Sequence, residues 1–439
     1  MSHADLLTRH LAVMPSWMTP YYEHPIQIVR GFDRRLVDGE GKTYLDFFGG
    51  IAVNSLGYSV PEVRDSVRRQ LARGVHHTST CYLIEQQVEL AERIARLSEI
   101  PDAKVFFVNS GTEAMEAALL FATTARRSSH VLTLRNGYHG RSFGSNAATS
   151  VLGWNASRLS PLQVSHVHNG HQFRGSLAQV PQDQVNAVCL EELRELIATI
   201  GGADIAAFVA EPMQGVGGLT IPPDGLLRAY QDELREHGIP VIVDEVQTGW
   251  GRLGSHFWGS GMHGITPDVM TFAKGLGSGF TIGGVVGRPE IIDSVTAKSM
   301  STFGGNPIAM AAGLATVNVL LSQDLQANAE KVGEIIRSGL DELSAGHPQI
   351  GEVRGRGLLL AIEIVVPGTT DPDPAAALRL HERARELGLL VGRGGPYGNV
   401  IRISPALNLS VAEAQEGLHI IAEAVRSDRS SQLDGGVRR

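Results

Sequence analysis

Lys274 is the residue of this chain best suited to act as a nucleophile. The sequence contains 5 lysines against 33 arginines, and Lys274 follows an apolar stretch at 267–273 and precedes a glycine-rich stretch at 275–279. A partly desolvated lysine can lose its proton and attack an aldehyde, whereas arginine keeps its charge at any accessible pH. The other lysines fit a polar turn, the start of a strand, a polar stretch and a helix surface: Lys42, Lys104, Lys298 and Lys331. Elimination therefore leaves Lys274 as the candidate nucleophile.

Asp244 supplies the group that such a lysine needs if its aldehyde is pyridoxal phosphate (PLP). The apolar run at 239–243 predicts a buried strand that ends on Asp244, at the sheet edge where open α/β folds bind ligands. An ionised aspartate there can keep the pyridine nitrogen of PLP protonated, which makes the ring an electron sink. Taken singly, each residue also has a structural explanation. Asp244 fits a helix N-cap, and Lys274 fits a surface amine.

A strand, a tight turn and a helix are predicted in succession over residues 103–122. The turn places Ser110, Gly111 and Thr112 at the start of the helix, where free N–H groups and the helix dipole bind phosphate. The chain contains no G-x-x-x-x-G-K-[ST] motif, so this is not a Walker P-loop. By itself, such a turn more often only caps its helix.

Another predicted strand, at 131–134, leads to Tyr138 and His139. The tyrosine ring can stack on a planar cofactor, although a lone Tyr-His pair usually serves packing.

These segments, in this order, resemble the class III aminotransferases of fold type I over nearly the whole chain. Within that family the sequence is most similar to the mitochondrial-type alanine–glyoxylate aminotransferase branch. The combination of Asp-Glu-Val-Gln-Thr-Gly at 244–249 with Ala-Lys-Gly at 273–275 is highly specific. Further matching stretches are Tyr-Leu-Asp-Phe-Phe-Gly-Gly at 44–50, His-Thr-Ser-Thr at 77–80, Val-Asn-Ser-Gly-Thr-Glu at 108–113, Ala-Glu-Pro-Met-Gln-Gly-Val-Gly at 210–217, Gly-Ser-His-Phe-Trp-Gly at 254–259, Thr-Phe-Gly-Gly-Asn-Pro at 302–307 and Val-Gly-Arg-Gly at 391–394.

The resemblance implies a role for each matching residue at the cofactor. Lys274 would form a Schiff base with PLP, and Asp244 would pair with the pyridine nitrogen. Gln247 would contact the ring hydroxyl, and Tyr138 would stack on the ring. The other implied cofactor contacts are Ser110, Gly111, Thr112, His139 and Thr302, the last of which would come from a partner subunit. The resemblance thus implies a homodimer with shared active sites, or a tetramer.

Two further residues are implied at the substrate. Arg402 matches the family arginine that binds the substrate carboxylate, a task suited to a planar bidentate donor. Glu211 matches a glutamate that can pair with that arginine when the substrate offers no carboxylate. Without the resemblance, Arg402 is better explained as a solvated arginine at a strand end. The chain departs from the family pattern at Tyr58, Trp250 and Gly284, which predicts a pocket volume different from the family norm.

Composition excludes several classes of function. A formal net charge of −8 argues against nucleic-acid binding, and no long apolar span or basic leader predicts a membrane or secreted protein. Cys81 and Cys189 lie far apart, and the 16 histidines form no ligand pattern, so no disulfide and no metal site is predicted. Together these features predict a cytoplasmic enzyme.

The alternation of helices and short apolar strands predicts an α/β fold with a mostly parallel, doubly wound sheet and a smaller C-terminal α/β domain. We expect an N-terminal arm at 1–60, a large PLP-binding domain at 61–320, the small domain at 321–426 and a disordered tail at 427–439.

The sequence thus predicts a PLP-dependent aminotransferase that uses alanine, β-alanine or a related amine as donor and pyruvate or glyoxylate as acceptor. Three alternatives remain at this point. One is a phospholyase that acts on a phosphorylated amine and shares the whole PLP site. The others are a non-catalytic binding or regulatory protein and a purely structural oligomer.

Overall fold

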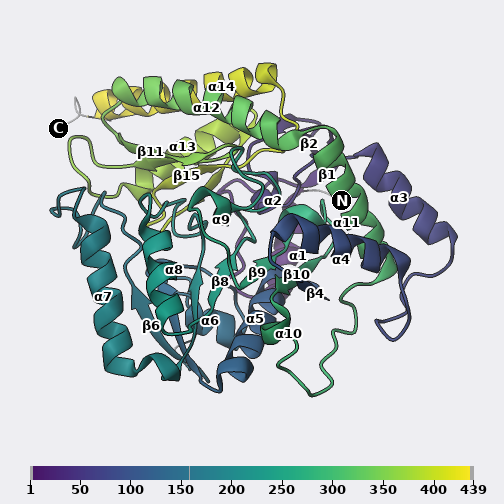
Figure 1. Ribbon diagram of the computed structural model, residues 1–439. Helices are drawn as coiled ribbons and strands as arrows, with labels where there is room; N and C mark the ends of the chain where they lie inside the picture. Colours follow the sequence, from purple (N-terminus) through teal and green to yellow (C-terminus); the bar gives the residue numbers. More distant parts are fainter. Residues whose placement is uncertain (1–2, 158, 436–439) are drawn as a thin grey trace.

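A computed structural model describes residues 3–157 and 159–435 (Figure 1). Its largest sheet has seven strands in the order β4-β10-β9-β8-β7-β5-β6, in which β10 alone runs against its neighbours. The strands are β4 (Lys104–Val108), β5 (His130–Leu134), β6 (Gln163–Val167), β7 (Ile205–Ala210), β8 (Val241–Asp244), β9 (Val269–Phe272) and β10 (Gly283–Gly287). The predicted mostly parallel sheet is therefore confirmed.

Both faces of this sheet are covered, as its continuous apolar strands require. All six residues of β7 are buried, and from Ala207 to Ala210 they alternate between two separate cores. Ala207 and Val209 pack with the helix α5 (Gly111–Arg126), whereas Phe208 and Ala210 pack with α7 (Val185–Ile200) and α8 (Leu226–Glu236). The remaining helical segments of this lobe are α3 (Pro61–Ala72), α4 (Glu85–Ser98), α6 (Phe143–Ala148), η1 (Gly202–Asp204), α9 (Gly259–Met262), η2 (Lys274–Leu276), α10 (Pro289–Ile292) and α11 (Pro307–Ser322).

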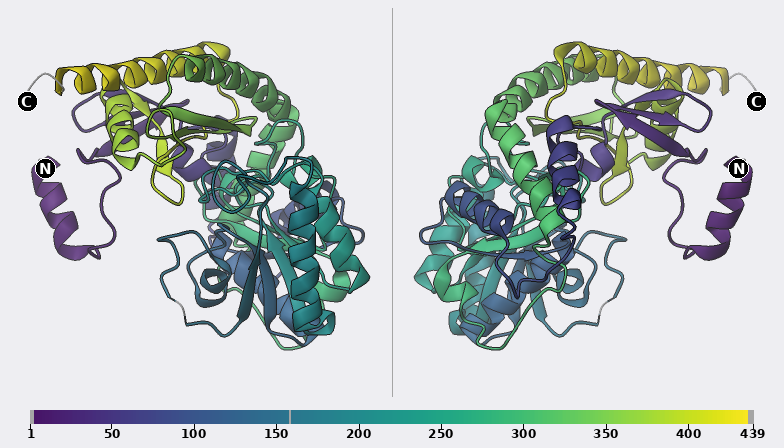
Figure 2. Two further views of the ribbon diagram at one scale, coloured as in Figure 1. Left: turned by 90° about the vertical axis from the view of Figure 1, so that its left-hand side faces the viewer. Right: turned by 90° about the vertical axis from the view of Figure 1, so that its right-hand side faces the viewer.

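A second lobe contains the C-terminal part of the chain, as Figure 2 shows. Its antiparallel sheet has the order β11-β12-β15-β14, with the helices α12, α13 and α14 packed against it or against one another. The strands are β11 (Ile350–Arg356), β12 (Leu359–Ile364), β14 (Gly392–Gly394) and β15 (Val400–Ile403). The helices are α12 (Leu325–Ala345), α13 (Pro374–Glu386) and α14 (Val411–Gly435).

The N-terminal segment joins this second lobe. The strands β1 (Ile28–Phe32), β2 (Arg35–Asp38) and β3 (Thr43–Asp46) form an antiparallel sheet, and β3 pairs in parallel with the short strand β13 (Leu389–Leu390). The helix α1 (His3–Val13) lies to the side of the body in both views of Figure 2, whereas α2 (Gly49–Ala52) follows β3. Pairing between positions more than three hundred residues apart leaves no periodic signal in the sequence.

The domain limits at 60, 320 and 426 stay predictions. The tail differs from its prediction, because α14 continues to Gly435, whereas 436–439 lie outside the described residues. A polar sequence lowers burial but does not by itself stop a helix that is already nucleated.

Among the described residues, no single helix has both the length and the hydropathy needed to cross a bilayer. Only α11 and α12 together reach the required length and hydropathy, and they are bent by 66° relative to each other.

Candidate active site

The loops that follow β4, β5, β7, β8 and β9 surround a cavity of about 200 Å³. These five strands run in one direction, so their carboxyl ends meet at one edge of the sheet. The cavity is lined by eight of the predicted site residues, namely Gly111, Thr112, Tyr138, His139, Glu211, Asp244, Gln247 and Lys274. Val246, Gly140 and Arg141 also line it, although they were not predicted as site residues.

Lys274 stands at the end of β9 and begins the short helix η2. Its backbone has a φ of +40°, an uncommon conformation for a residue with a Cβ, so the surrounding structure must hold it there. Burial lowers the pKa of Lys274, and the nearby charge of Arg402 lowers it further. The carboxylates of Asp244 and Glu211 oppose this only in part, and the pKa is about 8. The lysine is therefore no ordinary surface amine, because a substantial fraction is neutral near neutral pH.

Asp244 is held by three hydrogen bonds from neighbouring groups. Its Oδ1 accepts from the Thr271 hydroxyl at 3.1 Å and from the Val246 N–H at 3.2 Å, and its Oδ2 accepts from His139 Nδ1 at 2.8 Å. The next helix along the chain, α9, begins only at Gly259, so Asp244 is not the N-cap of a following helix. These three donors fix the carboxylate at the edge of the cavity.

His139 is buried behind this carboxylate. Burial alone would lower its pKa, but the hydrogen bond to Asp244 and the charges of Asp244 and Glu211 outweigh that effect, and the pKa is raised. His139 Nδ1 donates to the Asp244 carboxylate, and both side chains line the cavity. The histidine therefore orients the aspartate.

The sequence allowed two roles for the N-terminus of α5, a helix cap and a phosphate-binding helix start, and the structure is compatible with both. Ser110 is the N-cap, and its hydroxyl accepts from the Glu113 N–H at 3.3 Å. Gly111 follows at the edge of the cavity, where an added Cβ would lie 3.2 Å from the Val246 side chain. The Thr112 hydroxyl accepts from the N–H groups of Arg141 and Ser142, at 3.1 Å each. The turn is thus a cap, and it also presents the start of a helix dipole to the cavity.

Glu211 and Tyr138 are joined through the backbone. Glu211 is buried, and its carboxylate accepts from the N–H groups of Tyr138 and Gly215, at 2.9 and 2.8 Å. Burial raises its pKa strongly, His139 opposes the shift, and the pKa is about 7. The Tyr138 ring meets the edge of Trp154, with centroids 5.5 Å apart, and leaves a face available at the cavity.

Arg402 lies on β15 of the second lobe and is only 6% exposed, so it is not a solvated arginine at a strand end. Its Nη2 donates to Gln247 Oε1 at 2.7 Å, whereas its Nε is buried and without a partner among the described residues. Burial lowers its pKa, which Tyr21 and Glu211 oppose. Gln247 takes the Arg402 guanidinium, whereas Glu211 accepts from two backbone N–H groups. The pairing of Arg402 with Glu211 that the resemblance implies for a substrate without a carboxylate stays a prediction.

Tyr21 is the neighbour of this arginine that no sequence signal indicated. Its ring stacks on Phe48 with centroids 5.1 Å apart, and its hydroxyl donates to the Arg393 carbonyl at 2.6 Å. Tyr21 belongs to the N-terminal segment, and only the pairing of that segment with the C-terminal lobe brings it close to Arg402.

Thr302 does not reach the cavity within one chain. Its side chain is exposed, and it is absent from the residues that line the cavity. The three departures from the family pattern also lie outside that lining. Trp250 packs among Phe257, Trp258 and Phe272, the Tyr58 hydroxyl donates to Asp46 at 2.5 Å, and a Cβ at Gly284 would clash with Phe272.

The cavity fits PLP. The amine of Lys274, with its lowered pKa, suits the PLP aldehyde, and Asp244, which is fixed by a buried histidine, suits the pyridine nitrogen. The aromatic ring of Tyr138 suits the PLP ring, and the N-terminus of α5 suits the phosphate. When bound, PLP supplies an electron-withdrawing ring that stabilises negative charge on the substrate carbon.

Solved structures of PLP enzymes share this fold. A PLP-bound amine transaminase from an uncultivated Pseudomonas species is 30% identical, with a TM-score of 0.87 and coverage of 94% of this chain and 98% of that chain. A phospholyase from Arthrobacter, in complex with phosphoethanolamine, is 32% identical, with a TM-score of 0.87 and coverage of 96% and 100%. The predictions of fold type I and of PLP as the cofactor are therefore confirmed.

Two sequence relatives confirm the predicted likeness and overturn the predicted location. The mitochondrial alanine–glyoxylate aminotransferase 2 homolog 2 of Arabidopsis thaliana is 38% identical over 92% of this chain and 83% of that protein. The mitochondrial alanine–glyoxylate aminotransferase 2 of Homo sapiens is 34% identical over 97% and 87%. The prediction of a cytoplasmic enzyme is wrong, because both relatives are mitochondrial proteins. The prediction was drawn from a globular composition, which carries no information about the compartment.

The family model for class III aminotransferases matches residues 18–425, a range that includes both lobes and every predicted site residue. This chain is a member of the class III aminotransferases and a PLP-dependent enzyme.

Proposed function

We propose that the enzyme transfers an amino group from a small donor that carries a carboxylate, namely alanine, β-alanine or a related amine, to pyruvate or glyoxylate. The observation that carries this proposal is Arg402, a buried guanidinium whose Nη2 donates to the neutral Gln247 of the cavity lining and whose Nε has no partner among the described residues. A buried cation without a carboxylate partner favours an anionic ligand strongly. The names of the two relatives agree with alanine and glyoxylate as the pair.

In the proposed mechanism Lys274 moves the proton. Its Nζ has a pKa of about 8, so at neutral pH it can both accept a proton from the substrate carbon and return it. Asp244, oriented by His139, would pair with the cofactor nitrogen and favour its protonated form. Gln247 bridges the two ends of the site, since it contacts Arg402 and lines the cavity beside Asp244.

We also propose a homodimer, or a tetramer, that shares its active sites through Thr302. Exposed apolar residues surround this threonine in the single chain. Phe303 is 61% exposed and Met300 62%, and the ring of Phe303 contacts His77. Leu83, later in the segment that contains His77, is 98% exposed. Soluble monomers rarely expose so many neighbouring large apolar side chains. Sedimentation of the holoenzyme measures the number of subunits. Thr302→Ala should weaken PLP binding, because the threonine would contact the cofactor phosphate in the partner subunit.

A phospholyase acting on a phosphorylated amine is the second candidate. Its support is the similarity to the Arthrobacter phospholyase, together with Arg141, an exposed cation at the cavity that suits a substrate phosphate.

One spectroscopic experiment separates the two reactions. For the aminotransferase, L-alanine or β-alanine without a keto acid should convert the visible absorbance to that of pyridoxamine phosphate and stop after one turnover. Pyruvate or glyoxylate should then restore it. Continuous release of phosphate and ammonia from phosphoethanolamine, with no acceptor present, would establish the lyase and refute the aminotransferase proposal.

A further inference from the structure

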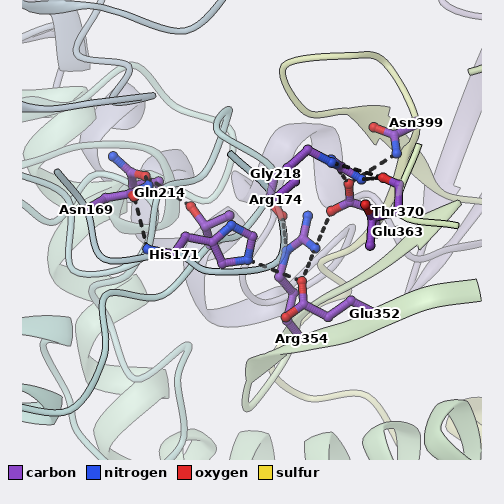
Figure 3. Close-up of polar contacts among 11 residues, drawn as sticks. Asn169, His171, Arg174, Gln214, Gly218, Glu352, Arg354, Glu363, Thr370 and Asn399 are labelled. Carbon is purple, nitrogen blue, oxygen red and sulfur yellow. Dashed lines mark hydrogen bonds and ion pairs between the residues drawn. The ribbon is translucent and has the colours of Figure 1, made fainter. Parts of the chain in front are cut away.

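A cluster of buried and partly buried charged side chains joins the two lobes (Figure 3). Arg354 on β11 is 6% exposed and forms ion pairs with Glu363 on β12 and with Glu352, the latter at 2.6 Å. Its Nε donates at 2.7 Å to the carbonyl of Gly218, in the loop that follows β7 of the large sheet. One guanidinium therefore spans from the C-terminal sheet to the loop that contains Glu211.

Two side chains of the large lobe complete this cluster from the segment that follows β6. Arg174 forms an ion pair with Glu363 and donates to the Thr370 carbonyl at 2.7 and 3.1 Å. His171 Nε2 lies 3.2 Å from Glu352. We call these five residues (His171, Arg174, Glu352, Arg354 and Glu363) the interlobe cluster.

On the C-terminal side, the cluster acts on the strand that contains Arg402. Glu363 is 2% exposed and pairs in register with Val400, two positions before Arg402 on β15. The Asn399 amide strengthens this link, because it donates to Glu363 at 3.2 Å and to the Ile364 carbonyl at 2.7 Å. A displacement of Glu363 therefore moves the backbone of β15.

On the other side, the cluster holds the loop that contains Glu211. Gly218 follows Gly215, whose N–H donates to the Glu211 carboxylate at 2.8 Å. Gly215 also lies against the Gln247 amide, since a Cβ there would meet it at 1.9 Å. Gln247 in turn accepts from Arg402. Both partners of the Arg402–Gln247 contact are thus connected to the cluster through backbone neighbours.

Stability alone is a weak explanation for such a cluster, because apolar side chains of similar volume often stabilise a buried site as well as an ion pair does. Ion pairs and bidentate hydrogen bonds do, however, fix direction and distance. We propose that Arg354, Glu363 and Arg174 are positioning residues that set the place of Arg402 against Gln247 of the cavity lining and so determine carboxylate affinity. This inference rests on the proposed role of Arg402 as the carboxylate-binding residue.

The test compares carboxylate affinity in matched variants of the holoenzyme. We would measure the half-reaction with L-alanine, its inhibition by propionate, the PLP content and the Tm. Glu363→Gln keeps the shape of the side chain but removes its charge. Since removing one charge from a buried cluster destabilises strongly, Arg174→Met serves as a second, milder variant at a side chain that is 20% exposed. The control is Arg34→Met, which breaks the Arg34–Glu413 pair elsewhere in the second lobe, where Nε lies 3.1 Å from each carboxylate oxygen and Nη2 lies 3.0 Å from Oε1.

We expect both cluster variants to raise the propionate inhibition constant and the half-saturating alanine concentration about tenfold, with the limiting rate constant within about twofold of wild type. Arg34→Met should lower Tm without changing carboxylate affinity. If the cluster variants lower Tm but leave propionate inhibition as it is in the control, the cluster is only structural and the inference is wrong. Arg402→Met separates the carboxylate-binding role of Arg402 from the positioning role of the cluster. If Arg402→Met leaves propionate inhibition unchanged, the proposed function itself is wrong. If Arg402→Met weakens propionate inhibition but the cluster variants do not, only the positioning role is wrong.

Discussion

The two ends of the cavity are built in different ways. The cofactor end comes from short sequence segments at the carboxyl edge of one parallel sheet, in which strand ends deliver Asp244 and Lys274. The substrate end is assembled from separate lobes, with Arg402 on a strand of the C-terminal sheet and Gln247 in a loop of the large sheet. Changes at the first end should therefore act on the chemical step. Changes at the second end should act on affinity.

The largest effect is expected at the cofactor end, for Lys274→Ala. Without Nζ no side chain moves the proton, and general acid–base catalysis of this kind contributes up to about 10⁴-fold. We expect kcat of the half-reaction to fall by roughly 10³-fold or more, while PLP still binds without a covalent link. Stopped-flow absorbance gives the rate, and borohydride reduction followed by peptide mapping identifies the labelled lysine. A wild-type rate in this variant would remove Lys274 from the mechanism.

Asp244→Asn should have the next largest effect. The amide keeps the shape but lacks the charge, so the pyridine nitrogen loses the group that keeps it protonated. Removal of one preorganised electrostatic contact of this kind costs about 10²- to 10³-fold in kcat. KM for alanine should change little, because the substrate end is intact. An unchanged kcat would mean that another group holds the ring nitrogen.

Arg402→Met tests the substrate end. Loss of a charge-assisted contact to a carboxylate costs about 1.5–3 kcal/mol, so KM for both alanine and pyruvate should rise by roughly 10- to 100-fold. The limiting rate should fall far less than in Asp244→Asn. A loss confined to kcat would contradict the expectation that changes at the substrate end act on affinity, because it would place Arg402 in the chemical step.

The smallest expected effect is a pH dependence of cofactor loading. In the cofactor-free protein the pKa of Lys274 is lowered to about 8, and only the neutral amine attacks the PLP aldehyde. The rate of PLP binding should thus rise about tenfold between pH 7 and 9 and then level off. A lysine of ordinary pKa would give a rise that continues beyond pH 10. Absorbance after mixing with PLP, in buffers of constant ionic strength, distinguishes the two profiles.

Much of the fold and of the cofactor end could be predicted because the signals are local. The buried runs before Asp244 and Lys274 read as strands, and both residues lie at the ends of β8 and β9. The turn at Ser110 reads as a helix start, and Ser110 is the N-cap of α5. Strands of one parallel sheet end at the same edge, so local prediction was enough to bring these groups together.

Contacts at the substrate end follow no spacing rule. The backbone N–H groups of Tyr138 and Gly215 take the Glu211 carboxylate, and Gln247 takes Arg402, and no sequence signal indicated these contacts. Each of these contacts depends on the direction in which a loop returns after its strand. The sequence pattern carries no information about that direction.

The amino-acid sequence by itself determined the mostly parallel sheet, the PLP cofactor and the family, because strand periodicity, helix starts and the motif at 244–249 are short-range properties. Only the tertiary structure decided that β3 pairs with β13, that Tyr21 lies near Arg402 and that Arg354 holds the Gly218 loop. These are contacts between positions more than one hundred residues apart. They form only when separately folded segments pack together, and packing depends on the shape of the whole core rather than on any one stretch of sequence.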